Sequence, residues 1–191
     1  RLQEIVLRKS CELVKQLNEF KICPEGFSIA INISACQFDT NLEERLCELI
    51  TEYALSPEYF KLEITESMLM EDVDNIVAKI QKLKNKGFRF SIDDFGTGYS
   101  SLSYLHAFPI DELKIDKSFV DQIAQSGSVI IDAIVSLSES FGFDVVAEGV
   151  EEQSQVDVLK QKNVDYFQGF FFARPMPSQD FINWLRRYPK R

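Results

Sequence analysis

Apolar positions along the chain switch repeatedly between the spacing of strands and the spacing of helices. Strand-like apolar runs recur at residues 27–34, 59–65, 89–93, 112–116, 143–150 and 166–172. Helical spacing separates them, and it predicts helices over 2–17, after a capping box formed by Thr40 and Glu43, over 73–83, from Ser100, over 128–141, over 152–162 and over 178–187. This strict alternation predicts a parallel sheet covered by helices.

Composition and charge narrow the class of protein. The chain has 191 residues, 45% of them hydrophobic and 27% charged, which is typical of one globular domain. It contains no apolar run of the ~18 residues that a membrane span needs, and we expect a cytoplasmic domain whose full-length parent is either free or membrane-tethered. The net charge of −9 disfavours DNA or RNA as a partner. Four cysteines without a CxxC pair, and one histidine, disfavour structural zinc.

Each strand-like run ends in a polar or charged residue. In chain order these are Asn32, Glu63, Asp93 with Asp94, Lys114, Glu148 and Gln168. Taken singly, each has an ordinary structural explanation, such as a turn, a solvated charge or a lysine whose ammonium reaches solvent. Gln168, within an aromatic run, is interpreted as an amide too costly to bury without a partner. Because parallel strands place their carboxyl ends on one rim, where α/β active sites lie, six such strand ends together predict a functional site.

The candidate residues favour a particular chemistry. Asn32, Glu63, Asp93, Asp94 and Glu148 offer only oxygen ligands, which suit hard cations such as Mg²⁺ or Mn²⁺. Two such ions ~3.5–4 Å apart can share a carboxylate and act together on a phosphate ester. Two adjacent aspartates can face different ions, and the cations offset the repulsion between their charges.

Several motifs in fixed order resemble one known family. "EITES" (63–67), "DDFGTGYSSLSYL" (93–105), "LKIDKSFV" (113–120), "VVAEGVE" (145–151) and "QGFFFARPMP" (168–177) are similar to the motifs of EAL-domain proteins. The resemblance covers almost the whole chain. It implies a TIM-like (β/α)₈ barrel and a bacterial signalling phosphodiesterase that hydrolyses cyclic di-GMP to linear pGpG with Mg²⁺ or Mn²⁺.

The resemblance also implies a role for each matching position. It assigns metal ligands to Asn32, Glu63, Asp93, Asp94 and Glu148, with Asp93 shared by two ions and with Asp94 and Glu148 on the second.

Further roles concern catalysis and the substrate. The resemblance implies that Lys114 contacts the nucleophilic water or the scissile phosphate, and we expect that Glu148 or Lys114 helps to deprotonate that water. It places Glu151 beside the catalytic residues and Gln168 on the substrate side. It implies that Glu66 anchors the loop after Asp94.

One departure from the family pattern is clear. The Glu-Ala-Leu motif that names the family does not occur in the chain, and six strands are predicted where a TIM barrel has eight. We therefore expect a single EAL-like domain over 1–191 without its first two strands, reduced activity of this fragment, and homodimerisation. Upstream sensory or GGDEF domains are expected in the full protein.

Two other functions remain open from the sequence. The first is a catalytically inactive receptor of the same fold that binds cyclic di-GMP. The second is a different barrel enzyme that uses strand-end carboxylates and one Mg²⁺, such as an enolase-type lyase.

Overall fold

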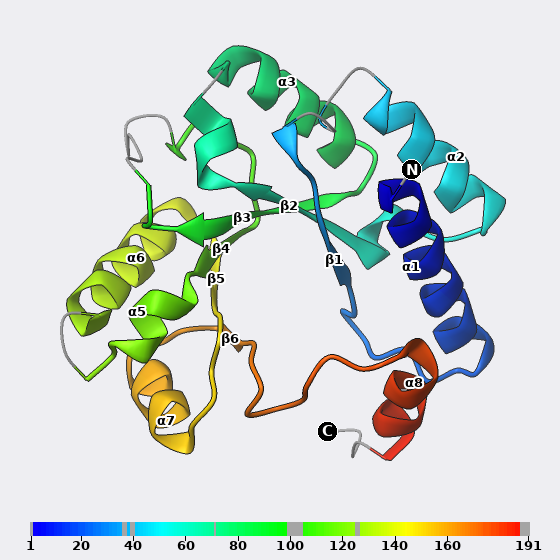
Figure 1. Ribbon diagram of the computed structural model, residues 1–191. Coiled ribbons are helices and arrows are strands. Elements are labelled where there is room, and N and C mark those ends of the chain that lie inside the picture. Colours follow the sequence, from blue (N-terminus) through cyan, green and yellow to red (C-terminus); the bar gives the residue numbers. More distant parts are fainter. Residues whose placement is uncertain are drawn as a thin grey trace.

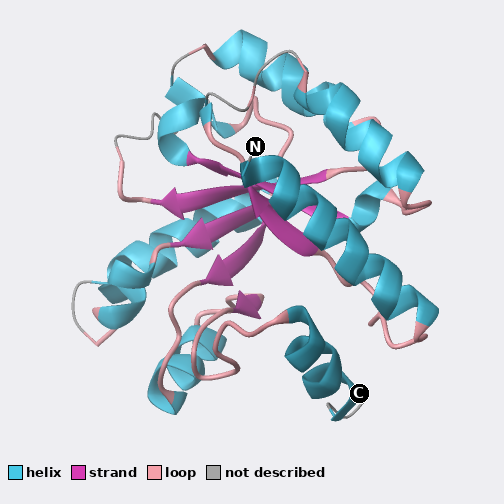
Figure 2. Cartoon of the chain, turned by 45° about the vertical axis from the view of Figure 1, so that its right-hand side comes forward, coloured by secondary structure: helices cyan, strands magenta, loops and turns pink. Residues whose placement is uncertain are grey.

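The sheet contains six parallel strands in sequential order, as the alternating pattern predicts. A computed structural model describes residues 2–35, 38, 41–70, 72–98, 105–124 and 127–187. The strands run in the order β1-β2-β3-β4-β5-β6, every neighbouring pair is parallel, and the arrows in Figure 2 point the same way. Their bounds are β1 Ile29–Asn32, β2 Phe60–Thr65, β3 Arg89–Phe95, β4 Glu112–Ile115, β5 Asp144–Ala147 and β6 Tyr166–Phe167.

Helices surround the outside of the curled sheet (Figure 1). They are α1 Leu2–Glu19, α2 Leu42–Glu52, α3 Val73–Lys84, α5 Lys117–Asp121, α6 Gly127–Phe141, α7 Gln153–Gln161 and α8 Ser178–Arg187, with short 3₁₀ turns η2 Pro57–Tyr59 and η3 Glu66–Met70. The chain therefore forms an α/β half-barrel.

The structure differs from the sequence prediction at several places. The strands expected over 27–34 and 143–150 are shorter and cover Ile29–Asn32 and Asp144–Ala147. The strand expected over 166–172 stops at Phe167, and turns follow it. The five-residue α5 was not predicted, because one turn is too short to show a helical period. Helix α2 has Asn41 as its N-cap, without a side-chain cap hydrogen bond, so the predicted capping box is wrong. Thr40 and the helix start expected at Ser100 lie outside the described residues.

The two faces of the sheet have opposite character. Leu62, Phe90 and Leu113 are completely buried and belong to the apolar core that the helices cover. Their neighbours along the strands point the other way, and these inner-face side chains are polar or charged, as at Lys61 and Glu112. Side chains alternate between faces in a strand, so the polar strand residues gather on the concave inner face.

The described strands leave β1 and β6 as the two edges of the sheet. A pocket of about 730 Å³ lies between them, lined by Phe27 and Ile29 at β1, Glu148 after β5, and Gly169 and Phe170 after β6. The pocket joins the site described below to the open side of the half-barrel. None of the described helices has both the length and the apolar character to span a membrane.

An ion pair on the inner face joins β2 to β4 across β3. The ammonium of Lys61 contacts the Glu112 carboxylate, and their side chains are 18% and 4% exposed. Burial raises the pKa of Glu112, and Lys61 offsets part of that increase. The order "KLE" in β2 is reversed as "ELK" in β4, so Glu63 and Lys114 form a second pair of opposite charges one layer further along. The inner face is thus built from charges that need partners.

We predict that Lys61→Met lowers the free energy of unfolding by roughly 3–5 kcal/mol, because Glu112 then stays buried without a cation. The pKa of Glu112 should rise further, so that folding takes up a proton. The loss should therefore be largest near about pH 8 and shrink as the pH falls toward about pH 5. Urea denaturation across this range measures it. The double variant Lys61→Met/Glu112→Leu should recover most of the loss, and an equally unstable double variant would contradict the interpretation.

Candidate active site

The ammonium group of Lys114 lies at the centre of the polar rim. Its Nζ is 2.8 Å from Oε1 of Glu63, 3.0 Å from Oδ1 of Asp93 and 2.6 Å from Oε1 of Glu148. The three acids come from β2, β3 and the end of β5, and Lys114 comes from β4. The lysine side chain is 4% exposed. An ammonium has three N–H donors, so these three carboxylates can take all of them.

Burial and charge together set the protonation behaviour of this cluster. Burial raises the pKa of both Glu63 and Glu148, and Lys114 offsets part of the increase in each. Burial alone would lower the pKa of Lys114, but the carboxylates, Glu63 foremost, raise it above its ordinary value. One cation faces three carboxylates, and the cluster therefore retains excess negative charge in a poorly solvated place.

Asp94 joins this cluster through an irregularity in β3. Its backbone is in the left-handed region, at φ +55°, and the register with β4 shifts between Ile92 and Phe95. A regular strand would turn adjacent side chains to opposite faces, whereas this bulge lets Asp93 and Asp94 serve one site. The hydroxyl of Thr97 donates to the Asp94 carbonyl, at 2.8 Å, and so fixes the turn. Burial and then Asp93 raise the pKa of Asp94.

Gln168 lies beside Glu148 because the turns after β5 and β6 continue the strand pairing. The backbone N–H of Gln168 donates to the Ala147 carbonyl, and the Val150 N–H donates to the backbone carbonyl of Gln168. Its side-chain Nε2 donates to Oε1 of Glu148 at 3.3 Å. Gln168 is exposed, so the interpretation of a buried amide is wrong. Its contact with Glu148 nevertheless places it at the predicted rim.

Glu66 lies under the turn that follows Asp94. It is buried, and its Oε2 accepts the N–H of Gly96 at 2.8 Å and that of Gly98 at 3.4 Å. A Cβ on Gly98 would lie 2.7 Å from Oε1 of Glu66, so glycine permits the close approach. The contact joins η3 to the end of β3.

The remaining candidates make no described contact with the Lys114 ammonium. Asn32 is paired in register with Glu63 at the end of β1, and it is exposed. Glu151 is exposed and contacts Lys117, outside the Lys114 cluster. Both stay predictions as site residues. Sequence reasoning missed Lys117, and the only signal was its place directly after the "KID" strand end.

The carboxylates suit a hard cation. One oxygen from each of Asp93, Asp94 and Glu148 can be chosen so that all three lie within 4.8 Å of one another. These are the ligand atoms that Mg²⁺ and Mn²⁺ prefer. Glu63 and Asp93 both contact the same lysine nitrogen. A second cation position on that side of Asp93 would therefore have the Glu63 carboxylate as a further ligand. The donor set therefore fits divalent cations.

The fold and the rim together define the class of protein: a barrel-type α/β domain with an acidic site at the carboxyl ends of its strands. The family model described as "EAL domain" matches residues 1–175. The chain belongs to the EAL domain family.

Several relatives support this assignment. The signaling protein YkoW of Bacillus subtilis is 42% identical over 167 residues, which are 86% of this chain and 21% of YkoW. MucR of Pseudomonas aeruginosa, a bifunctional diguanylate cyclase/cyclic di-GMP phosphodiesterase, is 39% identical over 159 residues, or 82% of this chain and 23% of MucR. The chain thus spans about a fifth of the length of these relatives.

Solved structures agree with the fold. The PaMucR phosphodiesterase in complex with c-di-GMP matches with a TM-score of 0.89 and 36% identity, over 94% of this chain and 73% of that one. BlrP1 of Klebsiella pneumoniae, in a manganese/cy-diGMP complex, matches with a TM-score of 0.82 and 28% identity, over 93% and 45%. The six-stranded half-barrel thus corresponds to part of an EAL barrel.

We predict that Lys114→Met destabilises the metal-free protein by roughly 3–5 kcal/mol, because three partly buried carboxylates lose their cation. Added Mn²⁺ should raise the melting temperature of this variant more than that of the unchanged protein, since the ion replaces the missing positive charge. Thermal unfolding with and without Mn²⁺ measures both effects. Lys86→Met, which loses an exposed ion pair with Glu43 and a contact with Cys47, is the control. Equal Mn²⁺ responses in the two variants would refute the electrostatic explanation.

We predict that Glu66→Ala loosens the turn after Asp94, because the N–H groups of Gly96 and Gly98 lose their acceptor. Losing such a partner costs about 1–3 kcal/mol locally. Hydrogen exchange of these two amides should accelerate, whereas exchange in β2 should not change. Glu66→Gln keeps an acceptor oxygen and should show a smaller effect. Unchanged exchange at Gly96 in the alanine variant would mean that Glu66 does not anchor the turn.

Proposed function

We propose that this domain hydrolyses cyclic di-GMP to linear pGpG with two divalent cations, Mg²⁺ or Mn²⁺, as part of a bacterial signalling protein. The carrying observation is the convergence of Glu63, Asp93 and Glu148 on Lys114, with Asp94 beside them, at one rim. The relatives support the substrate, since MucR is named as a cyclic di-GMP phosphodiesterase and PaMucR is described in complex with c-di-GMP.

The proposed metal ligands divide into two groups that share one residue. Asn32 and Glu63 serve the first position, Asp94 and Glu148 serve the second, and Asp93 serves both. Cations bound there would polarise the phosphodiester and make water a stronger nucleophile. The acidic site and the manganese in the BlrP1 complex support this proposal.

Two residues are proposed to act on the reacting groups. Glu148 is proposed to accept a proton from the attacking water, because its carboxylate lies at the rim beside Asp93 and Asp94. Lys114 stabilises negative charge on the phosphate, and its raised pKa keeps it protonated for that role. Because three carboxylates surround its ammonium, a phosphate oxygen reaches Lys114 by replacing one of them.

Gln168 is proposed on the substrate side, and Glu151 is proposed beside the catalytic residues. Both line the pocket of about 730 Å³ together with Glu148. The pocket opens from the rim toward the gap between β1 and β6, and it has room for a ligand larger than the scissile phosphate. The side-chain Nε2 of Gln168 can donate to Glu148, while the side-chain carbonyl oxygen of Gln168 remains available to accept a hydrogen bond from a nucleobase of the substrate.

We predict that Asp93→Asn in the full-length protein lowers kcat for cyclic di-GMP by at least about 10³-fold, because the position shared by both cations loses its charge. Chromatographic detection of pGpG with Mn²⁺ measures the rate. The control is Asp132→Asn, which changes an exposed carboxylate paired only with Lys162 among the contacts described.

Two outcomes would oppose this function. Full turnover by Asp93→Asn would exclude the two-cation mechanism. Tight binding of cyclic di-GMP by the unchanged protein, without any pGpG under Mg²⁺ or Mn²⁺, would instead identify the inactive receptor.

A further inference from the structure

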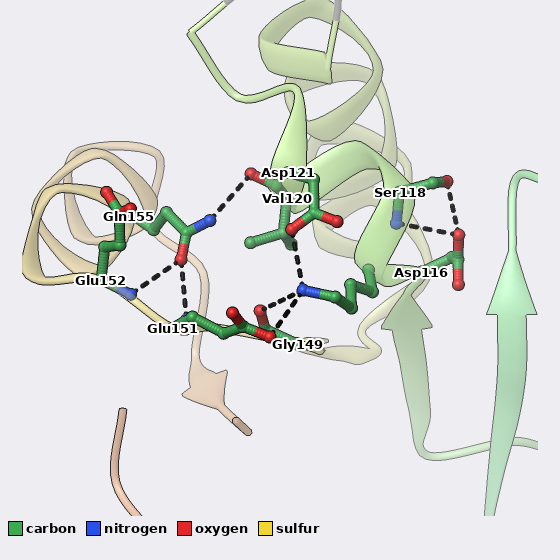
Figure 3. A network of polar contacts seen from close by, with 9 residues as sticks. Asp116, Ser118, Val120, Asp121, Gly149, Glu151, Glu152 and Gln155 are labelled. Carbon is green, nitrogen blue, oxygen red and sulfur yellow. Dashed lines mark hydrogen bonds and ion pairs between the residues drawn. The ribbon is translucent and has the colours of Figure 1, made fainter. Parts of the chain in front are cut away.

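The turn that carries Glu148 is attached to helix α5 by one lysine. The Nζ of Lys117, the first residue of α5, donates to Oδ1 of Asp121 at 2.9 Å, to Oε1 of Glu151 at 2.9 Å and to the Gly149 carbonyl at 3.4 Å. Figure 3 shows Asp121, Gly149 and Glu151 around this ammonium. Lys117 thus contacts the residue next to Glu148 and the end of the same turn.

The side-chain stem of Lys117 also fits the shape of this turn. Gly149 has φ +67°, and a Cβ there would lie 2.3 Å from Cγ of Lys117. The lysine methylenes therefore occupy the space that any larger residue at 149 would need, and the backbone carbonyl of Gly149 is held beside the ammonium. Both the position and the left-handed conformation of Gly149 suit this contact.

A second connection holds the other end of the turn. Oε1 of Gln155 accepts the N–H groups of Glu151 and Glu152, at 2.8 and 3.0 Å, and its Nε2 donates to the Val120 carbonyl of α5 at 3.4 Å (Figure 3). Helix α5 is fixed in turn by Asp116, whose Oδ1 accepts the Ser118 N–H at 3.0 Å. The segment after β5 is therefore attached to α5 at two points.

The Lys117 contacts contribute little to overall stability. The side chains of Lys117, Asp121 and Glu151 are 44%, 48% and 49% exposed, and ion pairs so exposed contribute about 0–1 kcal/mol. What distinguishes these contacts of Lys117 is that they lie directly after Glu148 in the chain. Glu148 lies one residue beyond β5, and although its N–H still donates to the Ile115 carbonyl of β4, the chain turns directly after it at Gly149.

We propose that Lys117 is a positioning residue: it holds the Gly149–Glu151 turn so that the Glu148 carboxylate faces Asp93 and Asp94. The proposal builds on the proposed function, since Glu148 is a cation ligand and proton acceptor there. Residues that orient a metal ligand typically change metal affinity 10- to 100-fold when they are removed. Lys117 makes no described contact with Glu148, Asp93 or Asp94, although it lines the same pocket as Glu148 and Gln168.

The test compares three variants of the full-length protein. Lys117→Met removes the ammonium and keeps a similar stem, and Lys117→Arg keeps a cation able to reach both acids. Lys162→Met is the control, because it removes an ion pair with Asp132 between α6 and α7. Three quantities are measured: the Kd for Mn²⁺ alone, by electron paramagnetic resonance, hydrogen exchange of residues 148–152, and kcat with KM for cyclic di-GMP.

The expected pattern is specific to Lys117→Met. Its Kd for Mn²⁺ should rise by about 10-fold or more, exchange in the turn should accelerate, and kcat should fall with little change in KM. Lys117→Arg should restore all three. Lys162→Met should resemble the unchanged protein in all three quantities.

Other results would overturn the proposal. A rise in KM alone would mean that Lys117 binds substrate, and equal Mn²⁺ affinities in the two methionine variants would mean that it positions nothing. If the unchanged protein has no phosphodiesterase activity but only Lys117→Met loses Mn²⁺ affinity, the proposed function fails and this inference stands. If the unchanged protein does not bind Mn²⁺, hydrogen exchange of residues 148–152 tests the inference instead. Equal exchange rates in both methionine variants would then overturn it.

Discussion

The interaction on which the inner face depends is the contact of the Lys114 ammonium with Glu63, Asp93 and Glu148. A buried ammonium is tolerated only with partners, and buried carboxylates have the same need. Since each partner comes from a different strand, the requirement is met only when β2, β3, β4 and β5 are in register and curled to one side. The ion cluster therefore favours a concave sheet, while the outer apolar residues Leu62 and Leu113 only require a covered one.

The same cluster is electrostatically incomplete. Three carboxylates face one ammonium, and Asp94 adds a fourth negative charge nearby. Burial raises the pKa of Glu63, Asp94 and Glu148, which means that the negative charge of these carboxylates is unfavourable in the folded protein. Further positive charge at the rim removes this penalty. Stability and the proposed chemistry thus impose opposite demands on the same side chains, a common property of functional sites.

Much of this arrangement could be predicted from the sequence because it depends on periodicity. The spacing of apolar residues predicts six strands. Glu63, Asp93, Lys114 and Glu148 lie toward the carboxyl ends of these strands in the sequence, which predicts their convergence. What failed depends on local geometry that has no period. The bulge that turns Asp94 inward, the early end of β6 that leaves Gln168 exposed, and the short α5 that presents Lys117 are set by tertiary contacts. Two adjacent aspartates indicate that the strand is irregular at this point. They do not indicate toward which face of the sheet the backbone directs the second aspartate.

The site residues fall into two groups that differ in how the backbone holds them. Glu63 and Lys114 lie inside strands with neighbours on both sides, so ladder hydrogen bonds fix them. Asp94 has a left-handed backbone, and Glu148 lies just past a strand with its N–H still bonded to the Ile115 carbonyl. Polar side chains hold the turns that follow both residues. Glu66 supports the first segment and Lys117 the second. A substitution in the strands therefore acts on folding and the site together, whereas one in the supporting side chains changes the geometry of the acidic cluster with little cost to the fold.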